Sequence, residues 1–132
     1  MTTAELIEKA KQAAENSYSP YSGFTVGAAL LARSGKVYLG CNIENSAYGP
    51  TNCAERTAFF KAISEGDREF DKIAIVGGSN LDFSSYCPPC GICRQVMSEF
   101  CDGSFTVILS RNNGEYKELT LDELLPFRFD LK

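Results

Sequence analysis

The run of apolar residues from Val26 to Ala32 is the feature that most limits how this chain folds. The residues around it, 24–33, hardly alternate between polar and apolar side chains, which is typical of a strand buried on both faces. The run is far too short to span a membrane, which takes about 20 residues. A strand of this kind needs a packed layer on each side. The sequence therefore predicts a sheet covered by helices on both faces.

Helix and strand signals alternate through the rest of the chain. Thr2 and Glu5 have capping-box spacing ahead of a helix that we expect to end near Asn16. We expect further helices after Asn52 up to Gly66, over 91–100 and for one turn after Thr120, and further strands over 36–44, 72–76, 105–109 and 116–119. This order predicts an α/β fold, a three-layer α/β/α sandwich with a mixed sheet of about five strands. Residues 1–132 are expected to form a single domain.

The strand expected over 36–44 places two polar side chains together. Val37, Leu39 and Cys41 share one face of this strand. Asn42 and Glu44 belong to the opposite face and stand near its end. The pattern therefore predicts two polar groups directed the same way.

Charge and composition exclude several classes of function. Thirteen Lys and Arg residues against 17 Asp and Glu residues give a net charge of −4, which argues against nucleic-acid binding through phosphate contacts. The chain has no histidine, so a metal site must use cysteine or carboxylate ligands, and no acid–base step can use an imidazole. The N-terminal residues contain no apolar signal segment, so we expect a cytoplasmic protein with no membrane partner.

Three of the six cysteines lie in the segment Cys87-Pro-Pro-Cys90-Gly-Ile-Cys93. A spacing of two residues lets two sulfur atoms reach one tetrahedral metal ion. Cys90 and Cys93 are expected in the first turn of one helix, and Cys53 at the start of another, where unpaired N–H groups stabilise thiolates. Three thiolates with a free fourth position are the composition of a catalytic zinc site, and Glu55 stands beside Cys53 as a group that can move protons.

The cysteines and Glu55 also fit roles outside catalysis. A glutamate in the first turn of a helix is favoured by the helix dipole alone. The cysteine run partly matches an iron–sulfur pattern, although Met97 stands where a fourth cysteine is needed. Cys87 as a fourth ligand would give a closed structural zinc site in a module that binds a protein partner. Spacing alone does not decide which two cysteines of the run bind the metal.

Longer motifs resemble a known family. Cys53-Ala-Glu55-Arg56-Thr-Ala together with Pro89-Cys90-Gly-Ile-Cys93-Arg94-Gln95 resembles the zinc-dependent cytidine deaminases of the small homotetrameric type. The resemblance also includes Ser19-Pro-Tyr-Ser-Gly-Phe24, Cys41-Asn42-Ile-Glu44-Asn45 and the Leu124-Leu-Pro-Phe tail, so it covers nearly the whole chain. Because Pro89 directly precedes Cys90, the motif leaves Cys87 outside.

This resemblance implies a metal site and a reaction. It implies that Cys53, Cys90 and Cys93 are the ligands of one Zn²⁺ ion and that Glu55 is the proton shuttle. The implied reaction is the hydrolytic deamination of free cytidine and deoxycytidine to uridine and deoxyuridine plus ammonia, a step of pyrimidine salvage. In it, water activated by zinc attacks C4 of the base.

The same resemblance implies the contacts of the substrate. They are Phe24 against the pyrimidine, Asn42 and Glu44 at the 3′ side of the ribose, Tyr48 in the pocket wall, the backbone around Ala54 at the base edge, and Phe127 at the site of a neighbouring subunit in a homotetramer. A carboxylate at the 3′ position penalises a phosphodiester there, so we expect a free nucleoside as substrate and no nucleic-acid partner. The nearest alternative is a deaminase of the same fold that acts on another aminopyrimidine such as blasticidin S.

Three positions carry expectations of their own. Three thiolates make a bound zinc ion a poor Lewis acid, so we expect Arg56 to donate N–H groups to a thiolate and withdraw charge. Ile92 stands where the family usually has a small residue, and the sequence alone does not decide the effect of this larger side chain on the packing below the metal. Cys87 lies outside the family pattern and is expected to be a neutral variant.

Overall fold

The strand predicted from the apolar run, β1 (Phe24–Ala32), lies inside a five-stranded sheet. The structure is a computed structural model that describes residues 1–132. On one side β1 pairs antiparallel with β2 (Val37–Cys41), and on the other side it pairs antiparallel with β3 (Phe70–Ser79). Residues 26–30 are all buried. The prediction of a strand covered on both faces is therefore confirmed.

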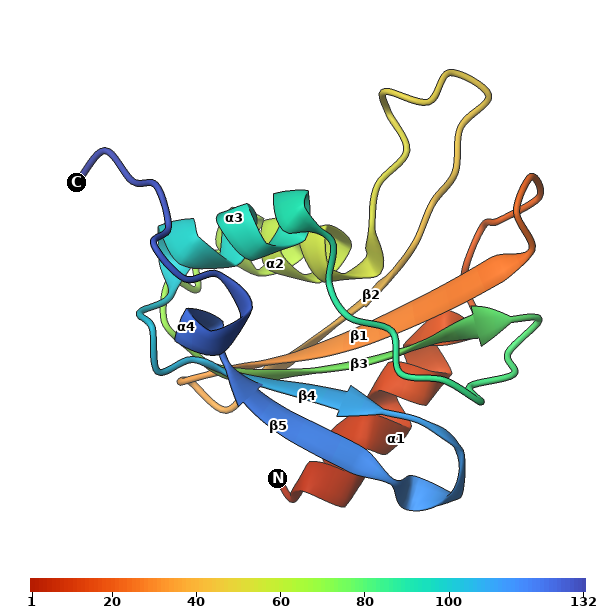
Figure 1. The fold of residues 1–132 in the computed structure, drawn as a ribbon, viewed down its shortest axis with the longest axis horizontal. Coiled ribbons are helices and arrows are strands. Elements are labelled where there is room, and N and C mark those ends of the chain that lie inside the picture. The colour runs from red at the N-terminus through yellow and green to blue at the C-terminus, as the bar shows by residue number, and fades with distance from the viewer.

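The sheet continues from β3 into the C-terminal part of the chain. β3 pairs in parallel with β4 (Thr106–Ser110), and β4 pairs antiparallel with β5 (Tyr116–Thr120). The strand order is β2-β1-β3-β4-β5, with one parallel pair among antiparallel ones (Figure 1). This is the mixed sheet of five strands that the sequence predicted.

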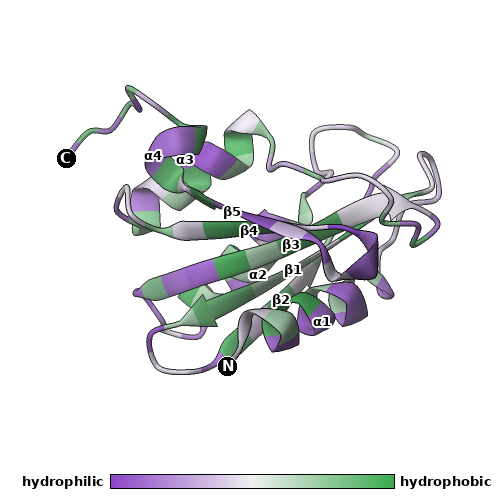
Figure 2. Cartoon of the chain, turned by 60° about the horizontal axis from the view of Figure 1, so that its bottom comes forward, coloured by the Kyte–Doolittle hydropathy of each residue, from purple (hydrophilic) through white to green (hydrophobic).

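Helices cover both faces of the sheet. α1 (Thr3–Ala14) lies on one face, and α2 (Ala54–Ser64) and α3 (Gly91–Phe100) lie on the other (Figure 1). Phe59 of α2 and Met97 of α3 are fully buried against the sheet. α1 alternates between hydrophilic and hydrophobic segments along its length, as expected of an amphipathic helix (Figure 2). The predicted three-layer α/β/α architecture is confirmed. None of the helices combines the length and the apolar composition needed to cross a bilayer.

Two glycines of the sheet let helices contact it backbone to backbone. A Cβ atom on Gly27 in β1 would lie 2.0 Å from the carbonyl oxygen of Ala10 in α1. On the opposite face, a Cβ atom on Gly40 in β2 would lie 2.2 Å from the carbonyl oxygen of Ala54 at the start of α2. Because no side chain fits into such contacts, backbone atoms fix the distance of each helix from the sheet.

β2 is shorter than the strand predicted over 36–44. It ends at Cys41 because only half of the next backbone pairing with β1 forms. The Asn42 N–H still donates to the carbonyl oxygen of Val26 at 3.3 Å, but the Asn42 carbonyl oxygen accepts the N–H of Tyr18 at 3.0 Å instead of that of Val26. The Asn42 Oδ1 accepts a hydrogen bond from the backbone N–H of Val26 at 3.0 Å, and its Nδ2 donates to the carbonyl oxygen of Phe24 at 2.8 Å. The Asn42 side chain thus accepts the Val26 N–H that the backbone of a longer β2 would have accepted.

β3 is longer than the strand predicted over 72–76, since Gly77 and Gly78 continue the pairing with β1. A Cβ atom on Gly77 would lie 2.6 Å from the Sγ of Cys87, and one on Gly78 would lie 1.8 Å from the carbonyl oxygen of Asp82. Glycine is required at both positions because the loop that follows β3 crosses over the end of the strand.

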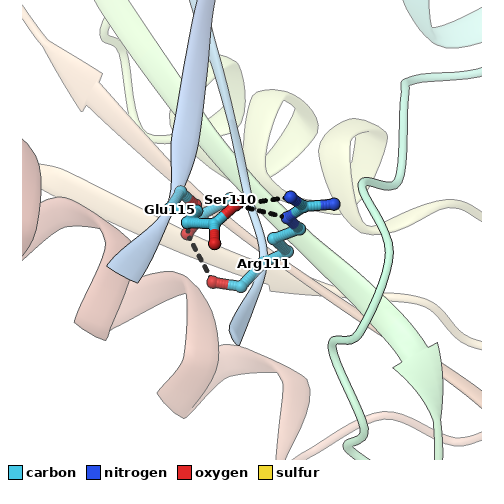
Figure 3. Close-up of polar contacts among 3 residues, drawn as sticks. All are labelled: Ser110, Arg111 and Glu115. Atoms are coloured by element: carbon cyan, nitrogen blue, oxygen red, sulfur yellow. Dashed lines mark hydrogen bonds and ion pairs between the residues drawn. The ribbon is translucent and has the colours of Figure 1, made fainter. Parts of the chain in front are cut away.

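The hairpin between β4 and β5 turns at the predicted Asn113-Gly114 pair, inside the short 3₁₀ turn η1 (Asn112–Gly114). Asn113 has φ 67° and Gly114 has φ 73°, the left-handed region that these two residues tolerate. Figure 3 shows how side chains close the turn: the Nε of Arg111 donates to the carboxylate of Glu115 at 2.9 Å, and the Ser110 hydroxyl donates to the Glu115 carbonyl at 3.1 Å. The predicted turn is confirmed.

The chain ends with α4 (Leu121–Leu124) and a tail that lies along α3. α4 begins with the predicted capping box: the Thr120 hydroxyl accepts the N–H of Glu123 at 3.2 Å, and the Glu123 carboxylate accepts the N–H of Thr120 at 2.9 Å. Further along, the side chain of Gln95 in α3 donates to the carbonyl oxygen of Phe129 at 2.9 Å. α3 therefore holds the tail in place.

Candidate active site

Cys53 and Cys90 are the N-cap residues of α2 and α3, and the N-termini of these two helices lie side by side (Figure 1). Neither side chain forms a capping hydrogen bond with its own helix, so both sulfur atoms are free to face each other. Cys93 follows within the first turn of α3 and is fully buried. The fold thus brings the three predicted metal ligands together at two helix ends that favour negative charge.

The three sulfur atoms have the spacing of a tetrahedral metal site. All lie within 4.8 Å of one another. The Sγ of Cys90 is 3.7 Å from that of Cys53 and 3.5 Å from that of Cys93. Sulfur atoms bound to one zinc ion at about 2.3 Å would stand about 3.8 Å apart along each edge of the tetrahedron. The cluster is therefore suited to hold one zinc ion through three protein ligands, the number typical of catalytic sites.

Cys87 is not a member of this cluster. Its side chain packs against β3 at Gly77, where an added Cβ would lie 2.6 Å from the Cys87 Sγ and 3.3 Å from the ring of Phe24. Burial raises the pKa of the Cys87 thiol to about 11, so this thiol stays neutral. The geometry thus groups three cysteines and leaves out the fourth one that a closed structural site requires.

Arg56 contacts the cluster directly. Its Nη2 donates a hydrogen bond to the Sγ of Cys53 at 3.2 Å. Hydrogen bonds from Cys93 and from Arg56 lower the pKa of Cys53 to about 5, so that this ligand is a thiolate at neutral pH. The Arg56 side chain is partly buried, and its Nε is buried without a partner. This is the contact that the charge argument predicted.

Glu55 is buried beside the cluster, with 4% of its surface exposed. It belongs to the first turn of α2, two residues after Cys53. Burial, together with the negative charge of Cys53, raises the pKa of Glu55 to about 7. A carboxyl group with this pKa can both accept and release a proton near neutral pH.

An open cavity of about 260 Å³ begins at Cys53, Glu55 and Cys90. Four of the predicted substrate contacts also line it, namely Phe24, Asn42, Glu44 and Ala54. The side chain of Phe24 is 40% exposed, so a face of the ring is available to a bound molecule. β1, the loop after β2 and the start of α2 thus gather these residues around one space.

Asn42 and Glu44 offer this cavity one donor and one acceptor. The Asn42 Oδ1 accepts from the Val26 N–H and the Ser17 hydroxyl, and one N–H of its Nδ2 donates to a backbone carbonyl of β1. The second N–H of Nδ2 is therefore the free group. A hydrogen bond from the Ser22 hydroxyl lowers the pKa of Glu44, so its carboxylate is ionised and accepts only. A donor beside an acceptor is complementary to a hydroxyl group.

Besides Cys93 and Arg56, three residues singled out from the sequence do not line the cavity. Tyr48 is 89% exposed and lines an adjoining hollow, which shares Ser22 and Glu44 with the cavity. Phe127 is fully exposed at the C-terminus, with φ 52°. Ile92 is 62% exposed on the outer side of α3, so most of its side chain faces away from the core.

Sequence reasoning missed the roles of Ser17 and Ser22, whose hydroxyl groups contact Asn42 and Glu44. Both precede β1 in a loop whose composition indicates only a turn. The motif Ser19-Pro-Tyr-Ser-Gly-Phe24 contains Ser22, but periodicity does not show that its hydroxyl faces a carboxylate from another loop.

A protein-family model, that of the cytidine and deoxycytidylate deaminase zinc-binding region, matches residues 1–109 of the sequence. The chain belongs to this deaminase family. A cytidine deaminase from Sporosarcina psychrophila is 54% identical over 98% of this chain and 92% of the relative, and one from Halalkalibacterium halodurans is 53% identical over 94% and 91%. The crystal structure of a cytidine deaminase from Burkholderia pseudomallei has a TM-score of 0.90 at 47% identity and covers 98% of this chain and 100% of that chain.

Membership of the deaminase family agrees with the chemistry of the three-cysteine cluster. The matching family region binds zinc, and three thiolates at tetrahedral spacing are ligands that zinc prefers. The predicted deaminase family and the predicted zinc cofactor are both confirmed.

Proposed function

We propose that this deaminase hydrolyses free cytidine and deoxycytidine to uridine and deoxyuridine, with release of ammonia. One observation carries the proposal: Cys53 and Cys90 of the three-cysteine cluster, the donor–acceptor pair of Asn42 and Glu44, and the buried Glu55 all line a single cavity. The cytidine deaminases of Sporosarcina psychrophila and Halalkalibacterium halodurans support the same substrate class. Such an enzyme serves pyrimidine salvage.

Glu55 performs both proton transfers of the reaction. Cys53, Cys90 and Cys93 would hold the zinc ion, which when bound activates water as a nucleophile near neutral pH. As the water oxygen adds to C4 of cytosine, Glu55 takes one water proton and delivers it to N3. Glu55 then carries the second proton from the new hydroxyl group to the exocyclic amine, which leaves as ammonia while C4 becomes a carbonyl. Its pKa of about 7 suits a group that accepts and releases protons in turn.

The remaining cavity residues orient the nucleoside. Phe24 lies against the pyrimidine ring, and the backbone N–H groups around Ala54 meet the base edge. The free N–H of Asn42 donates to the 3′ hydroxyl of the sugar, and Glu44 accepts the proton of that same hydroxyl. A 3′ phosphate has no proton to give and is repelled by Glu44, so polynucleotides are excluded.

We infer that residues 1–132 form one catalytic domain and that the active enzyme is a homotetramer in which Phe127 reaches a neighbouring site. Exposed apolar side chains support this assembly: Phe127, Phe129 and Leu131 of the tail are largely or fully exposed. Such side chains gathered at one place commonly mark a contact surface between chains.

Turnover of cytidine by protein of known zinc content tests the proposed reaction. We expect the ultraviolet absorbance of cytidine to change to that of uridine, with one ammonia released for each cytidine consumed. A panel that includes deoxycytidine, cytidine monophosphate and blasticidin S measures the specificity. If zinc-loaded protein leaves cytidine unchanged, the proposal is wrong, and turnover of blasticidin S alone would identify the alternative substrate class.

Arg56→Ala is expected to lower kcat by about tenfold while the zinc content stays near that of the unmodified protein. The guanidinium withdraws charge from Cys53, so its loss weakens the Lewis acidity of the bound metal more than the binding of the metal. Steady-state kinetics and metal analysis of the same sample measure both effects. Arg68→Ala is the matched control, because Arg68 donates only to backbone carbonyls away from the site. Unchanged kinetics for Arg56→Ala would contradict the charge argument.

A further inference from the structure

We propose that Ser22 is a positioning residue of the sugar site. Its hydroxyl group holds one carboxylate oxygen of Glu44 in place, and this oxygen offers a free lone pair to the sugar. The inference rests on the proposed nucleoside substrate. Ser22 takes no part in the proton transfers, and it acts through Glu44 rather than on the reacting atoms.

The two oxygens of the Glu44 carboxylate are held differently. Oε1 accepts two backbone hydrogen bonds, from the N–H of Tyr21 at 3.0 Å and from the N–H of Ser22 at 3.1 Å. Oε2 accepts only the hydroxyl of Ser22. No lysine or arginine forms an ion pair with Glu44. Oε1 is therefore a pivot fixed by backbone, and the Ser22 hydroxyl is the single group that stops Oε2 from turning about it.

The hydroxyl of Ser22 is itself oriented by the start of β1. It accepts the backbone N–H of Phe24 at 3.0 Å, so its own proton is directed to Glu44. The loop is braced on both sides: the N–H of Gly23 donates to the carbonyl oxygen of Ser19 at 2.9 Å, and the N–H of Asn80 donates to the carbonyl oxygen of Gly23 at 3.0 Å. Ser22 thus joins the strand that carries the base-contacting ring to the carboxylate that contacts the sugar.

A count of lone pairs shows what this arrangement leaves for the substrate. An ionised carboxylate has about four acceptor sites, two on each oxygen. Both sites of Oε1 and one site of Oε2 are occupied, so one acceptor site on Oε2 remains. Without the Ser22 hydroxyl this site has no fixed direction, and the sugar must order the carboxylate when it binds.

Ser22→Ala measured on two substrates tests the proposal. For cytidine we expect KM to rise about tenfold with kcat changed less than about twofold, because the lost contact orders a binding group and not the reacting atoms. For 3′-deoxycytidine, which lacks the hydroxyl that Glu44 accepts, we expect kcat/KM to change less than about twofold. Ser22→Thr keeps a hydroxyl at an exposed position and is expected to restore the KM for cytidine.

Ser46→Ala is the matched control, an exposed serine of the loop after β2 whose hydroxyl forms no hydrogen bond. We expect it to change neither substrate. Equal losses of Ser22→Ala on cytidine and on 3′-deoxycytidine would overturn the proposal, because they would show a general disturbance of the loop. Unchanged kinetics of Ser22→Ala on both substrates would overturn it as well. Failure of the unmodified protein to turn over cytidine would instead refute the proposed function on which the inference rests.

Discussion

Glu55→Gln is expected to keep one zinc ion per chain and to lose about 10³-fold in kcat. Glutamine has nearly the same volume as glutamate, and the cluster suited to bind the metal consists of three cysteines without Glu55. We therefore expect metal binding to persist. An amide cannot take a proton from water and release it to N3 or to the leaving amine. Both transfers are therefore lost together. Metal analysis and steady-state turnover of cytidine on the same preparation measure the two quantities.

The control for this variant is Glu65→Gln, at the C-terminal end of the same helix. Glu65 is exposed and remote from the cavity, so we expect its kcat to change less than about twofold. If Glu55→Gln retained the turnover of the unmodified protein with zinc bound, Glu55 would not be the proton shuttle.

Cys90→Ser is expected to weaken zinc binding by more than about 100-fold. Removing a residue that only hydrogen-bonds to a metal ligand already lowers metal affinity by up to about that factor, and Cys90 is itself a proposed ligand. The serine hydroxyl does not ionise at neutral pH, so the cluster keeps only two thiolates. Cys90 suits this test better than Cys93 because it is exposed, whereas Cys93 is fully buried in the core. Zinc retained after dialysis against a chelator, together with turnover, measures the effect. We expect activity to fall in proportion to the zinc that is lost.

Cys87→Ser is the matched control, only three residues away in the same loop. Its sulfur packs on Gly77 and lies outside the three-sulfur cluster, so we expect the zinc content to stay at one ion per chain. Loss of zinc from Cys87→Ser would show that the metal has four cysteine ligands and would favour a structural site over a catalytic one.

Most of the architecture could be predicted because each element has a local signal of its own. The unbroken run in β1 requires two covering layers, and Ala54, Ala58 and Ala62 mark the side of α2 that packs on the sheet. The turn at Asn113-Gly114 and the capping box of α4 are equally local. Each of these signals depends only on residues close together in the sequence, so it can be recognised without the structure.

The predicted strand ends are wrong where a residue far away in the sequence determines where a strand stops. Alternation continues past Cys41, yet β2 ends there because the carbonyl oxygen of Asn42 accepts the N–H of Tyr18, while its side chain accepts the N–H of Val26 in β1. Gly77-Gly78 has the composition of a strand end, yet β3 includes it.

In the candidate site, too, the features with a local signal could be predicted and the contacts between distant residues could not. The helix-start positions of Cys53, Cys90 and Glu55 follow from local sequence. The contact of Ser22 with Glu44 joins two loops that meet only in the folded chain, and no spacing along the sequence indicates it.

The glycine contacts under α1 and α2 have a consequence for sequence drift. Gly40 seats α2, which carries Cys53 and Glu55 at its N-terminus, directly on the backbone of β2. At this contact, backbone atoms and not side chains set the height of α2 above the sheet. A side chain at position 40 would displace the start of α2, which carries Cys53 and Glu55, whereas an exchange of one core side chain for another leaves this backbone contact in place. Substitutions in the core are therefore expected to disturb the positions of Cys53 and Glu55 less than a substitution of Gly40.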